Sequence, residues 1–298
     1  MKILLLGKNG QVGWELQRSL ATLGELTALD FDSADFRADF TDPGSLAATV
    51  RALRPDVIVN SAAHTAVDKA ESEPALARTI NAVAPGVLAR EAASLGATLV
   101  HYGTDYVFDG SGSTPRAEDA PTGPLSAYGA TKLEGEDAIR ASGCRHLILR
   151  TSWVYAARGG NFAKTMLKLA SERDQLTVID DQFGAPTGAE LLADVTAHAL
   201  RVLRLRPELA GTYHAVAAGE THWHGYATHV IEWARAHGQP IKVAADAILP
   251  VPTSAFPTPA KRPLNSRLDT RKLRETFGVV MPPWQQGVER MLAEYLGR

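Results

Sequence analysis

The sequence predicts an α/β protein in which a parallel sheet is covered by helices on both faces and is joined to a smaller lobe of mixed helix and strand. Short β-rich runs alternate with amphipathic helical patterns over the first 150 residues. The strand-like runs are nearly continuous apolar stretches, as expected for strands that are buried on both faces. After residue 150 the alternation becomes irregular, which indicates a second structural unit.

Each expected element follows from its local pattern. The strands of the parallel sheet are expected at residues 2–7, 26–30, 56–63, 97–103 and 146–155. Between them, the longest amphipathic segment predicts a helix over residues 75–96. Beyond residue 150, we expect helices at 161–173, 188–205, 223–238 and 284–296, and strands at 176–180 and 212–217. A proline-rich stretch at 249–269 precedes the last helix.

Composition excludes several classes of function. The chain has 298 residues, of which 45% are hydrophobic, so it can bury a large core. Its 31 Lys and Arg nearly balance 33 Asp and Glu, which argues against a nucleic-acid or membrane partner. No apolar stretch approaches the roughly 20 residues of a membrane span, so we expect a soluble cytoplasmic protein. Cys144 is the only cysteine and is expected to be inert packing.

A glycine-rich turn follows the first expected strand directly and opens a helix. Its glycines, Gly7, Gly10 and Gly13, would let a pyrophosphate approach the main chain and let the helix pack closely on the strand. The helix N-terminus then supplies free N–H donors. Asp30 ends the second strand, where a carboxylate would accept hydrogen bonds from an adenosine ribose. These features predict a Rossmann-type doubly wound sheet that binds a dinucleotide.

The identity of the dinucleotide stays open at this point. Asp30 argues for NADH, because a carboxylate would repel a 2′-phosphate. Alternatively, Asp30 only caps a strand, and a nearby Arg or Lys admits NADPH. The segment 38–40, which precedes the next helix, is a plausible place for the adenine.

A tyrosine and a lysine four residues apart begin the helix that follows the fourth expected strand. The i,i+4 spacing places Tyr128 and Lys132 on one helical face. The lysine ammonium would lower the tyrosine pKa, so that Tyr128 can donate a proton to a carbonyl oxygen as hydride arrives. Thr104, at the strand end, would bind the same oxygen, and Lys132 would bind the nicotinamide ribose. This spacing also occurs by chance, but the joint order of turn, acid, threonine, tyrosine and lysine favours catalysis.

The ensemble resembles the extended short-chain dehydrogenase/reductases, and more specifically the dTDP-4-dehydrorhamnose reductase family. The resemblance spans nearly the whole chain and is carried by these segments: "GKNGQVGWELQ", "NSAAHTAVDKAESEP", "INAVAP", "HYGTDYVFDG", "YGATKLEGE", "RTSWVY", "NFAKTML", "DQFGAPTGAELLAD" and "RPLNSRLDT". It implies reduction of the 4-keto group of dTDP-4-dehydro-L-rhamnose by NADPH or NADH, which supplies rhamnose for surface polysaccharides such as the lipopolysaccharide O-antigen.

The resemblance also implies a division of the chain and of its site residues. Residues 1–150, with about 188–218, would bind the cofactor, and residues 151–187 with 219–298 would bind the sugar nucleotide. The cofactor contacts would be Gly10, Gln11, Val12, Asp30, Asp39, Phe40, Ala63, His64, Thr65 and Tyr102. The sugar would face Thr104, Asp105, Tyr128 and Trp153. An aromatic plane just past a strand end suits a hexose, although Trp153 is alternatively a core residue.

One departure from related families is informative. Nucleotide-sugar dehydratases that resemble this chain carry Asp-Glu after the strand-end threonine, because loss of water across a C–C bond needs an additional acid and base. Here the residues are Asp105 and Tyr106. Simple reduction is therefore the expected reaction.

Several weaker signals complete the set. The resemblance implies a structural Mg²⁺ that bridges a homodimer through glutamates matching Glu15, Glu190 and Glu294, although plain solvated glutamates are the alternative. Arg262 would pair with the substrate diphosphate or serve as a surface arginine. Gln182 and Phe183 would also touch the nucleotide. For His222, His224 and His229 we expect surface or packing roles rather than a metal site.

Two other functions fit the same fold. One is a non-catalytic NADP-binding regulatory subunit, similar to the partner of methionine adenosyltransferase. The joint presence of Thr104, Tyr128, Lys132 and Trp153 argues against it. The other is a nucleotide-sugar epimerase, against which the segments "RTSWVY" and "DQFGAPTGAE" argue.

Overall fold

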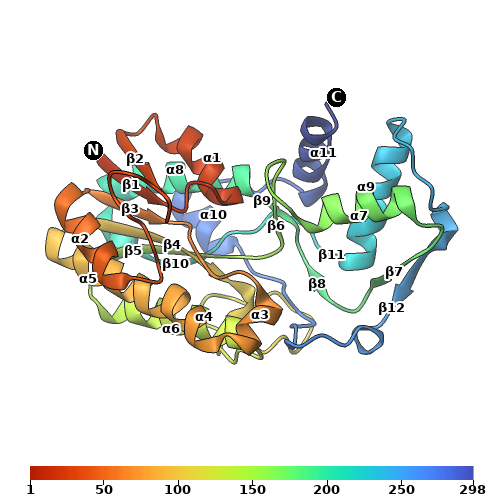
Figure 1. Ribbon diagram of the computed structural model, residues 1–298, viewed down its shortest axis with the longest axis horizontal. Coiled ribbons are helices and arrows are strands. Elements are labelled where there is room, and N and C mark those ends of the chain that lie inside the picture. Colours follow the sequence, from red (N-terminus) through yellow and green to blue (C-terminus); the bar gives the residue numbers. More distant parts are fainter. Residues whose placement is uncertain (298) are drawn as a thin grey trace.

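A six-stranded parallel sheet forms the larger part of the computed structural model, which describes residues 1–297 (Figure 1). The strand order is β10-β5-β4-β3-β1-β2, and every pairing is parallel. The strands are β1 (Lys2–Leu6), β2 (Glu25–Leu29), β3 (Val57–Asn60), β4 (Thr98–Thr104), β5 (Arg145–Thr151) and β10 (Gly211–His214). Strand order reverses at β1, beside β3, where sheets of this type bind ligands. The expected Rossmann-type doubly wound fold is confirmed.

Helices cover both faces of this sheet because successive strand residues point to opposite sides. Ile3 and Leu5 pack toward α1 (Gln11–Leu20), α8 (Ala189–Leu205) and α10 (Arg271–Phe277). Leu4 and Leu6 pack toward the opposite face. That face is covered by α2 (Pro43–Leu53), α5 (Ala84–Leu95) and α6 (Ala127–Ala141), with α3 (Val67–Ser72), α4 (Pro74–Arg78) and a π-helical turn (Thr79–Val83) near α6.

The smaller lobe is built mainly from helices and pairs of short strands. Its helices are α7 (Phe162–Glu172), α9 (Trp223–Ala236) and α11 (Trp284–Tyr295). Its strands are β6 (Val154–Tyr155), β7 (Leu176–Ile179), β8 (Phe183–Gly184), β9 (Thr187–Gly188), β11 (Thr221–His222) and β12 (Ile248–Val251). They form the pairs β6–β9, β7–β12 and β8–β11. Tyr226, Val230, Trp284 and Val288 form the core of this lobe.

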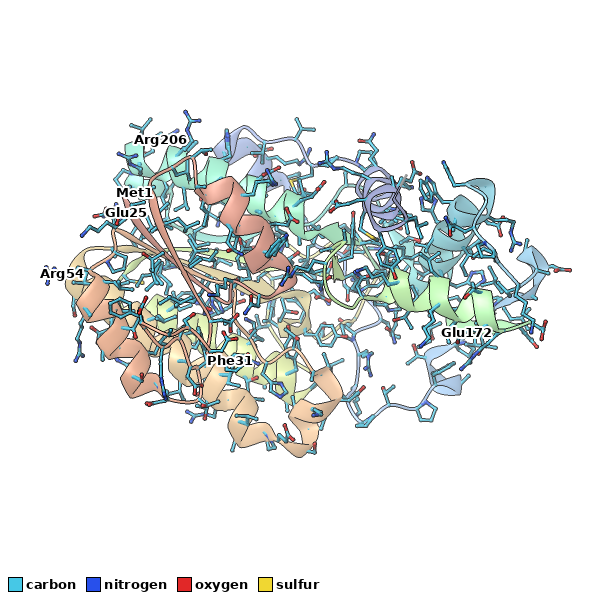
Figure 2. All side chains as sticks on the ribbon, turned by 45° about the horizontal axis from the view of Figure 1, so that its top comes forward. Met1, Glu25, Phe31, Arg54, Glu172 and Arg206 are labelled. Atoms are coloured by element: carbon cyan, nitrogen blue, oxygen red, sulfur yellow. The ribbon has the colours of Figure 1, made fainter. Side chains whose placement is uncertain are left out.

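The carboxyl ends of the large sheet face the smaller lobe. In Figure 2, Met1 and Glu25 mark the amino ends of β1 and β2, at the end of the molecule that lies far from Glu172 in the smaller lobe. The opposite ends of the strands therefore meet the junction of the two lobes. One-turn 3₁₀ helices occur in the connections, at Asp105–Val107, Pro207–Leu209, Ala245–Ala247 and Thr253–Ala255.

The structure differs from the expected elements in several places, of which three bear on the arrangement of the lobes. The single strand expected at 146–155 is broken between β5 and β6, because Trp153 has a left-handed backbone with φ of 48°. The proline-rich stretch contains a strand, β12. Helix α10 was not expected separately, and its Leu273 and Phe277 pack in the core of the large sheet, within a range that the pattern assigns to the smaller lobe.

None of the helices in residues 1–297 combines the length and the apolar character needed to cross a membrane.

Candidate active site

The glycine turn joins β1 to α1 with a geometry that side chains would prevent. Gly7 has a φ of 85°, in the left-handed region that favours glycine. A Cβ atom on Gly13 would lie 1.9 Å from the Gly7 carbonyl oxygen, so α1 can approach the turn this closely only with glycine. The N-terminus of α1 has no side-chain cap and no acidic residue in its first turn. Its N–H groups are therefore available to a phosphate, and the turn fits a dinucleotide.

Asp30 follows β2 and lies beside this turn. Its carboxylate accepts hydrogen bonds from the backbone N–H groups of Asn9, at 3.1 Å, and Phe31, at 2.9 Å. These bonds fix the carboxylate at the edge of the cavity described below. This is the position that suits a ribose hydroxyl.

One cavity of about 570 Å³ unites most of the predicted site residues. Those that line it are Gly7, Gly10, Gln11, Val12, Asp30, Ala63, Thr65, Tyr102, Thr104, Asp105, Tyr128, Lys132 and Trp153. The cavity begins at the glycine turn, crosses the carboxyl ends of the strands and reaches the smaller lobe. Its lining also includes residues that the sequence did not single out, among them Ser61, Val67, Thr151 and Trp223.

Besides Gly13, whose place against Gly7 is given above, three predicted cofactor residues lie outside this lining. The Asp39 carboxylate accepts bonds from the N–H and hydroxyl of Thr41, which lower its pKa. Phe40 is buried in the core beneath α2. The backbone N–H of His64 donates to Asn81 at 2.9 Å. The roles of these three residues at the cofactor stay predictions.

Tyr128 and Thr104 meet where α6 begins. The Ser126 hydroxyl caps the helix by accepting the N–H of Gly129 at 3.2 Å, which places Tyr128 in the first turn above the end of β4. The Tyr106 ring meets the Tyr128 ring edge-on, with centroids 5.5 Å apart. Burial raises the pKa of Tyr128 to about 12, although a hydrogen bond with the Thr104 hydroxyl acts in the opposite direction. Tyr128 is therefore protonated at neutral pH.

Lys132 does not act on Tyr128 as the spacing predicts. Its Nζ donates to the carbonyl oxygen of Tyr102 at 2.6 Å and lies 3.2 Å from Nε2 of His101. The predicted lowering of the Tyr128 pKa by the lysine is wrong for this arrangement, because the amine points toward β4. Burial also lowers the pKa of Lys132 itself to about 8.

Asp105 is a buried carboxyl beside this pair. Its Oδ1 accepts from the Thr104 hydroxyl at 3.2 Å, whereas Oδ2 has no hydrogen-bond partner within residues 1–297. Burial raises the pKa of Asp105 to about 7. A carboxyl that changes charge near neutrality therefore lies at the wall of the cavity.

Two stacked tryptophans form the wall on the side of the smaller lobe. The Trp153 and Trp223 rings lie 3.8 Å apart and 18° from parallel. Gln182 accepts the Trp223 indole N–H at 3.0 Å and is itself fixed by Thr253 at 3.1 Å. Trp223 was missed in the sequence because it reads only as the start of an amphipathic helix. The available signal was an aromatic residue at the N-terminal end of a helix in the smaller lobe.

Arg262 and Phe183 are placed beside the cavity rather than in its lining. The Arg262 guanidinium binds the Asp68 carboxylate through two nitrogens, at 2.8 and 3.2 Å. This ion pair ties the proline-rich segment to α3. Phe183 lies under the guanidinium of Arg267, 4.4 Å from its ring centroid.

The three glutamates proposed for magnesium border one surface hollow but do not form a ligand group. Glu190 lies 3.2 Å from Arg290, and Glu15 lies 3.5 Å from Arg18, while Glu294 lines the same hollow. Throughout residues 1–297, no cluster of three or more His, Cys, Asp or Glu side chains is arranged to hold a metal. The ion that the resemblance implies would bridge two copies of the chain, and it stays a prediction.

The three histidines of the smaller lobe contact their own surroundings. His222 caps α9 by accepting the N–H of Gly225, and His224 Nε2 lies 2.9 Å from the Ile248 carbonyl oxygen. His229 lies 3.2 Å from Glu289.

Comparison with known sequences gives a consistent result. The family model described as the RmlD substrate binding domain matches residues 1–296. The chain is 59% identical to the dTDP-4-dehydrorhamnose reductase of Shigella flexneri over 294 residues, which cover 99% of this chain and 98% of that protein. It is 58% identical to the protein of the same name from Escherichia coli K12, with the same coverage.

Solved structures agree with the sequence comparison. A dTDP-4-dehydrorhamnose reductase from Clostridium acetobutylicum is 38% identical, with a TM-score of 0.88 and full coverage of both chains. One from Bacillus anthracis, solved in complex with NADP, is 33% identical, with a TM-score of 0.86, and covers 98% of this chain and 99% of its own.

Proposed function

Since this chain belongs to the dTDP-4-dehydrorhamnose reductase family, we propose that it reduces the C4 keto group of dTDP-4-dehydro-β-L-rhamnose, with Tyr128 as the proton donor. One observation carries the proposal. A single cavity joins the phosphate-binding glycine turn to Thr104, Tyr128 and Lys132 and ends at a tryptophan wall. Such a cavity can hold a dinucleotide and a hexose against each other.

The cofactor side of the cavity supports NADPH or NADH. The N–H groups of the first turn of α1, at Gln11 and Val12, would bind the pyrophosphate, and Asp30 would bind the adenosine ribose. Ala63, Thr65 and Tyr102 would line the nicotinamide ribose. When bound, the reduced nicotinamide supplies the hydride.

On the substrate side, Tyr128 and Thr104 would hold the ketone oxygen. Both hydroxyls can donate to that oxygen, and the high pKa of Tyr128 keeps its proton available until negative charge develops on the substrate. The proton then passes from the Tyr128 hydroxyl to the C4 oxygen. Lys132 would bind the nicotinamide ribose.

The sugar nucleotide would extend from Tyr128 into the smaller lobe. Trp153 offers an aromatic face to the hexose, and the neighbouring Trp223 completes that wall. Asp105 would bind a sugar hydroxyl. We retain the division of labour between the lobes, with α10 counted as part of the cofactor-binding unit because it packs on the large sheet.

The proposal is tested by mixing the purified protein with dTDP-4-dehydro-β-L-rhamnose and either NADH or NADPH. The loss of absorbance of the reduced nicotinamide is then followed. We expect turnover, with dTDP-L-rhamnose identified by NMR as the product. Absence of turnover with both cofactors, in a protein that still binds one of them, would instead favour the regulatory-subunit alternative. A change of sugar configuration without net cofactor oxidation would favour the epimerase.

A further inference from the structure

A chain of buried polar groups runs beneath α6 from β3 to Lys132. Asn60 and His101 are direct neighbours in the parallel pairing of β3 with β4. Nδ2 of Asn60 lies 3.0 Å from Nδ1 of His101, and Nε2 of the same ring lies 3.2 Å from Nζ of Lys132. All three side chains are buried. The imidazole is therefore held on both of its nitrogens.

The direction of each hydrogen bond in this chain follows from one fixed donor. The backbone N–H of Ala62 can only donate, and it donates to Oδ1 of Asn60 at 3.0 Å. The amide NH₂ of Asn60 must then face His101, so Nδ1 of the ring accepts. Burial holds the pKa of His101 well below its ordinary value, so the ring is neutral. Its hydrogen is therefore on Nε2 and points at Lys132.

This polarity determines the form of the lysine. An N–H that points at Nζ needs a lone pair to accept it, and only the neutral amine has one. The amine then donates one of its own hydrogens to the carbonyl oxygen of Tyr102. An ammonium in the same place would have one of its hydrogens facing the Nε2–H of His101, with no lone pair between them.

The acidic charge that favours the ammonium form of Lys132 is already paired with two arginines. Glu136, one turn further along α6, is the acid whose charge acts on it, but that carboxylate is shared by Arg150 at 2.8 Å and Arg140 at 3.2 Å. The other titratable groups at this place are His101 on β4, Tyr128 on α6 and Asp105 after β4. Within residues 1–297, no carboxylate forms an ion pair with Lys132.

We propose that Asn60 and His101 are positioning residues that stabilise the neutral amine of Lys132 against β4, so that in alkaline solution a cofactor ribose that binds the ammonium form brings a proton onto Lys132. The second half rests on the proposed function, because it needs a dinucleotide in the cavity. One proton passes from solvent to the lone pair of Nζ, and no electrons or covalent bonds to carbon change. Cofactor binding is then coupled to the uptake of a proton.

The coupling has a definite sign. A bound cofactor that raises the Lys132 pKa above its free value of about 8 leaves affinity unchanged below that pH. Above it, the cofactor must bring in a proton, so affinity falls by roughly tenfold for each pH unit until the pKa of the complex is reached. A lysine that is an ammonium in both forms would give no such dependence.

The first half is tested without any cofactor. In ¹⁵N-labelled protein, long-range ¹H–¹⁵N spectra distinguish the two imidazole tautomers, and the His101 signals are identified by their loss in His101→Gln. We expect an unprotonated Nδ1 and a protonated Nε2. At about pH 9, where the amine of Lys132 is neutral, an Nδ1–H tautomer or an imidazolium would overturn the positioning chain even if the protein proves to be an active reductase.

The second half is tested by titrating the full-length protein with NADH in a calorimeter, in two buffers of different ionisation enthalpy. At about pH 9 we expect uptake of about one proton per NADH, and much less at about pH 6. NADH that binds with no proton uptake at either pH overturns the coupling alone. NADH that fails to bind overturns the proposed function.

Two substitutions at His101 separate positioning from packing. We call the pH above which NADH affinity begins to fall the alkaline break. His101→Gln keeps an acceptor toward Asn60 and a donor toward Lys132, so its alkaline break should stay near pH 8. His101→Leu removes the donor that stabilises the amine, and the break should move up by about one pH unit. A purely structural role would lower affinity equally at all pH values and leave the break in place.

A matched control is available in the same sheet. His214 ends β10, is also buried, and both of its ring nitrogens lack partners within residues 1–297. His214→Gln removes a buried imidazole without touching the positioning chain, so its break should match the wild type. A break displaced as far in His214→Gln as in His101→Leu would contradict the proposal.

Discussion

The two ends of the cavity are built from different parts of the chain. Beside β1, its shape is set by backbone, because Gly7 and Gly13 allow helix and turn to meet with no side chain between them. Beside α6, it is set by buried titratable side chains, Asp105, Tyr128 and Lys132, whose pKa values are shifted by burial. The end beside β1 therefore depends on the absence of side-chain atoms at the turn. The end beside α6 depends on the protonation states of its side chains.

The largest effect is expected at Tyr128, the proposed proton donor. Tyr128→Phe removes the hydroxyl but keeps the ring that packs on Tyr106. We expect the rate of the chemical step to fall by roughly 100-fold or more while NADH affinity stays near the wild-type value, as for a lost general acid. Single-turnover kinetics and equilibrium cofactor binding measure the two separately. An unchanged rate would remove Tyr128 from the mechanism.

The buried carboxyl should appear in the pH dependence of stability. The folded pKa of Asp105, about 7, lies above its ordinary value, so the folded state binds the extra proton and stability falls as pH rises toward 7. Asp105→Asn removes this loss. We expect the variant to gain about 2 kcal/mol relative to wild type between pH 5 and pH 8, measured by urea unfolding.

Asp109→Asn is the control for that experiment. Asp109 is exposed, and its pKa is lowered by hydrogen bonds from the backbone and side chain of Ser111. The variant should show no gain at the higher pH. Equal pH profiles for wild type and Asp105→Asn would show that the Asp105 carboxyl is not held neutral by burial.

The end of the cavity beside β1 should be sensitive to added side-chain volume and not to pH. A methyl group on Gly13 would meet the Gly7 carbonyl oxygen, so Gly13→Ala must displace α1. We expect a loss of about 1–3 kcal/mol in the free energy of unfolding and weaker NADH binding at every pH. Gly160→Ala is the matched control, because nothing lies within 4 Å of the added atom. Normal NADH affinity in Gly13→Ala would contradict a backbone-built phosphate site.

The smallest effect is expected at the tryptophan wall. Trp223→Phe keeps an aromatic ring against Trp153 but removes the indole N–H that donates to Gln182. We expect kcat/KM for the sugar nucleotide to fall by roughly two- to tenfold, with NADH affinity unchanged. A change in NADH affinity of similar size would place Trp223 with the cofactor instead.

Much of the backbone end could be predicted from sequence. Glycines at Gly7, Gly10 and Gly13 and an acid at Asp30 are local signals, because the turn and the helix that use them are adjacent in the chain. Thr104, Tyr128 and Lys132 were predictable for the same reason. Their spacing puts them at a strand end and on one face of the following helix.

The remaining contacts depend on registers and rotamers that spacing does not determine. Asn60 meets His101 only because β3 and β4 pair in one particular register. The spacing of Tyr128 and Lys132 gives a shared helical face, but not the turn of the lysine amine toward β4. Arg262 reaches Asp68 across 194 positions of sequence, so its partner was not visible in any local pattern.

The left-hand and right-hand lobes of Figure 1 are not separate lengths of chain. The polypeptide leaves the large sheet after β5, returns for α8 and β10, leaves again for α9 and β12, returns for α10 and finishes in α11. Cutting at any one loop would therefore liberate no fragment with a complete core. The lobes are connected by several segments of the chain and not by a single hinge. These connections restrain the rotation of one lobe relative to the other. Substrate capture should accordingly involve rearranged side chains more than a wide closing movement.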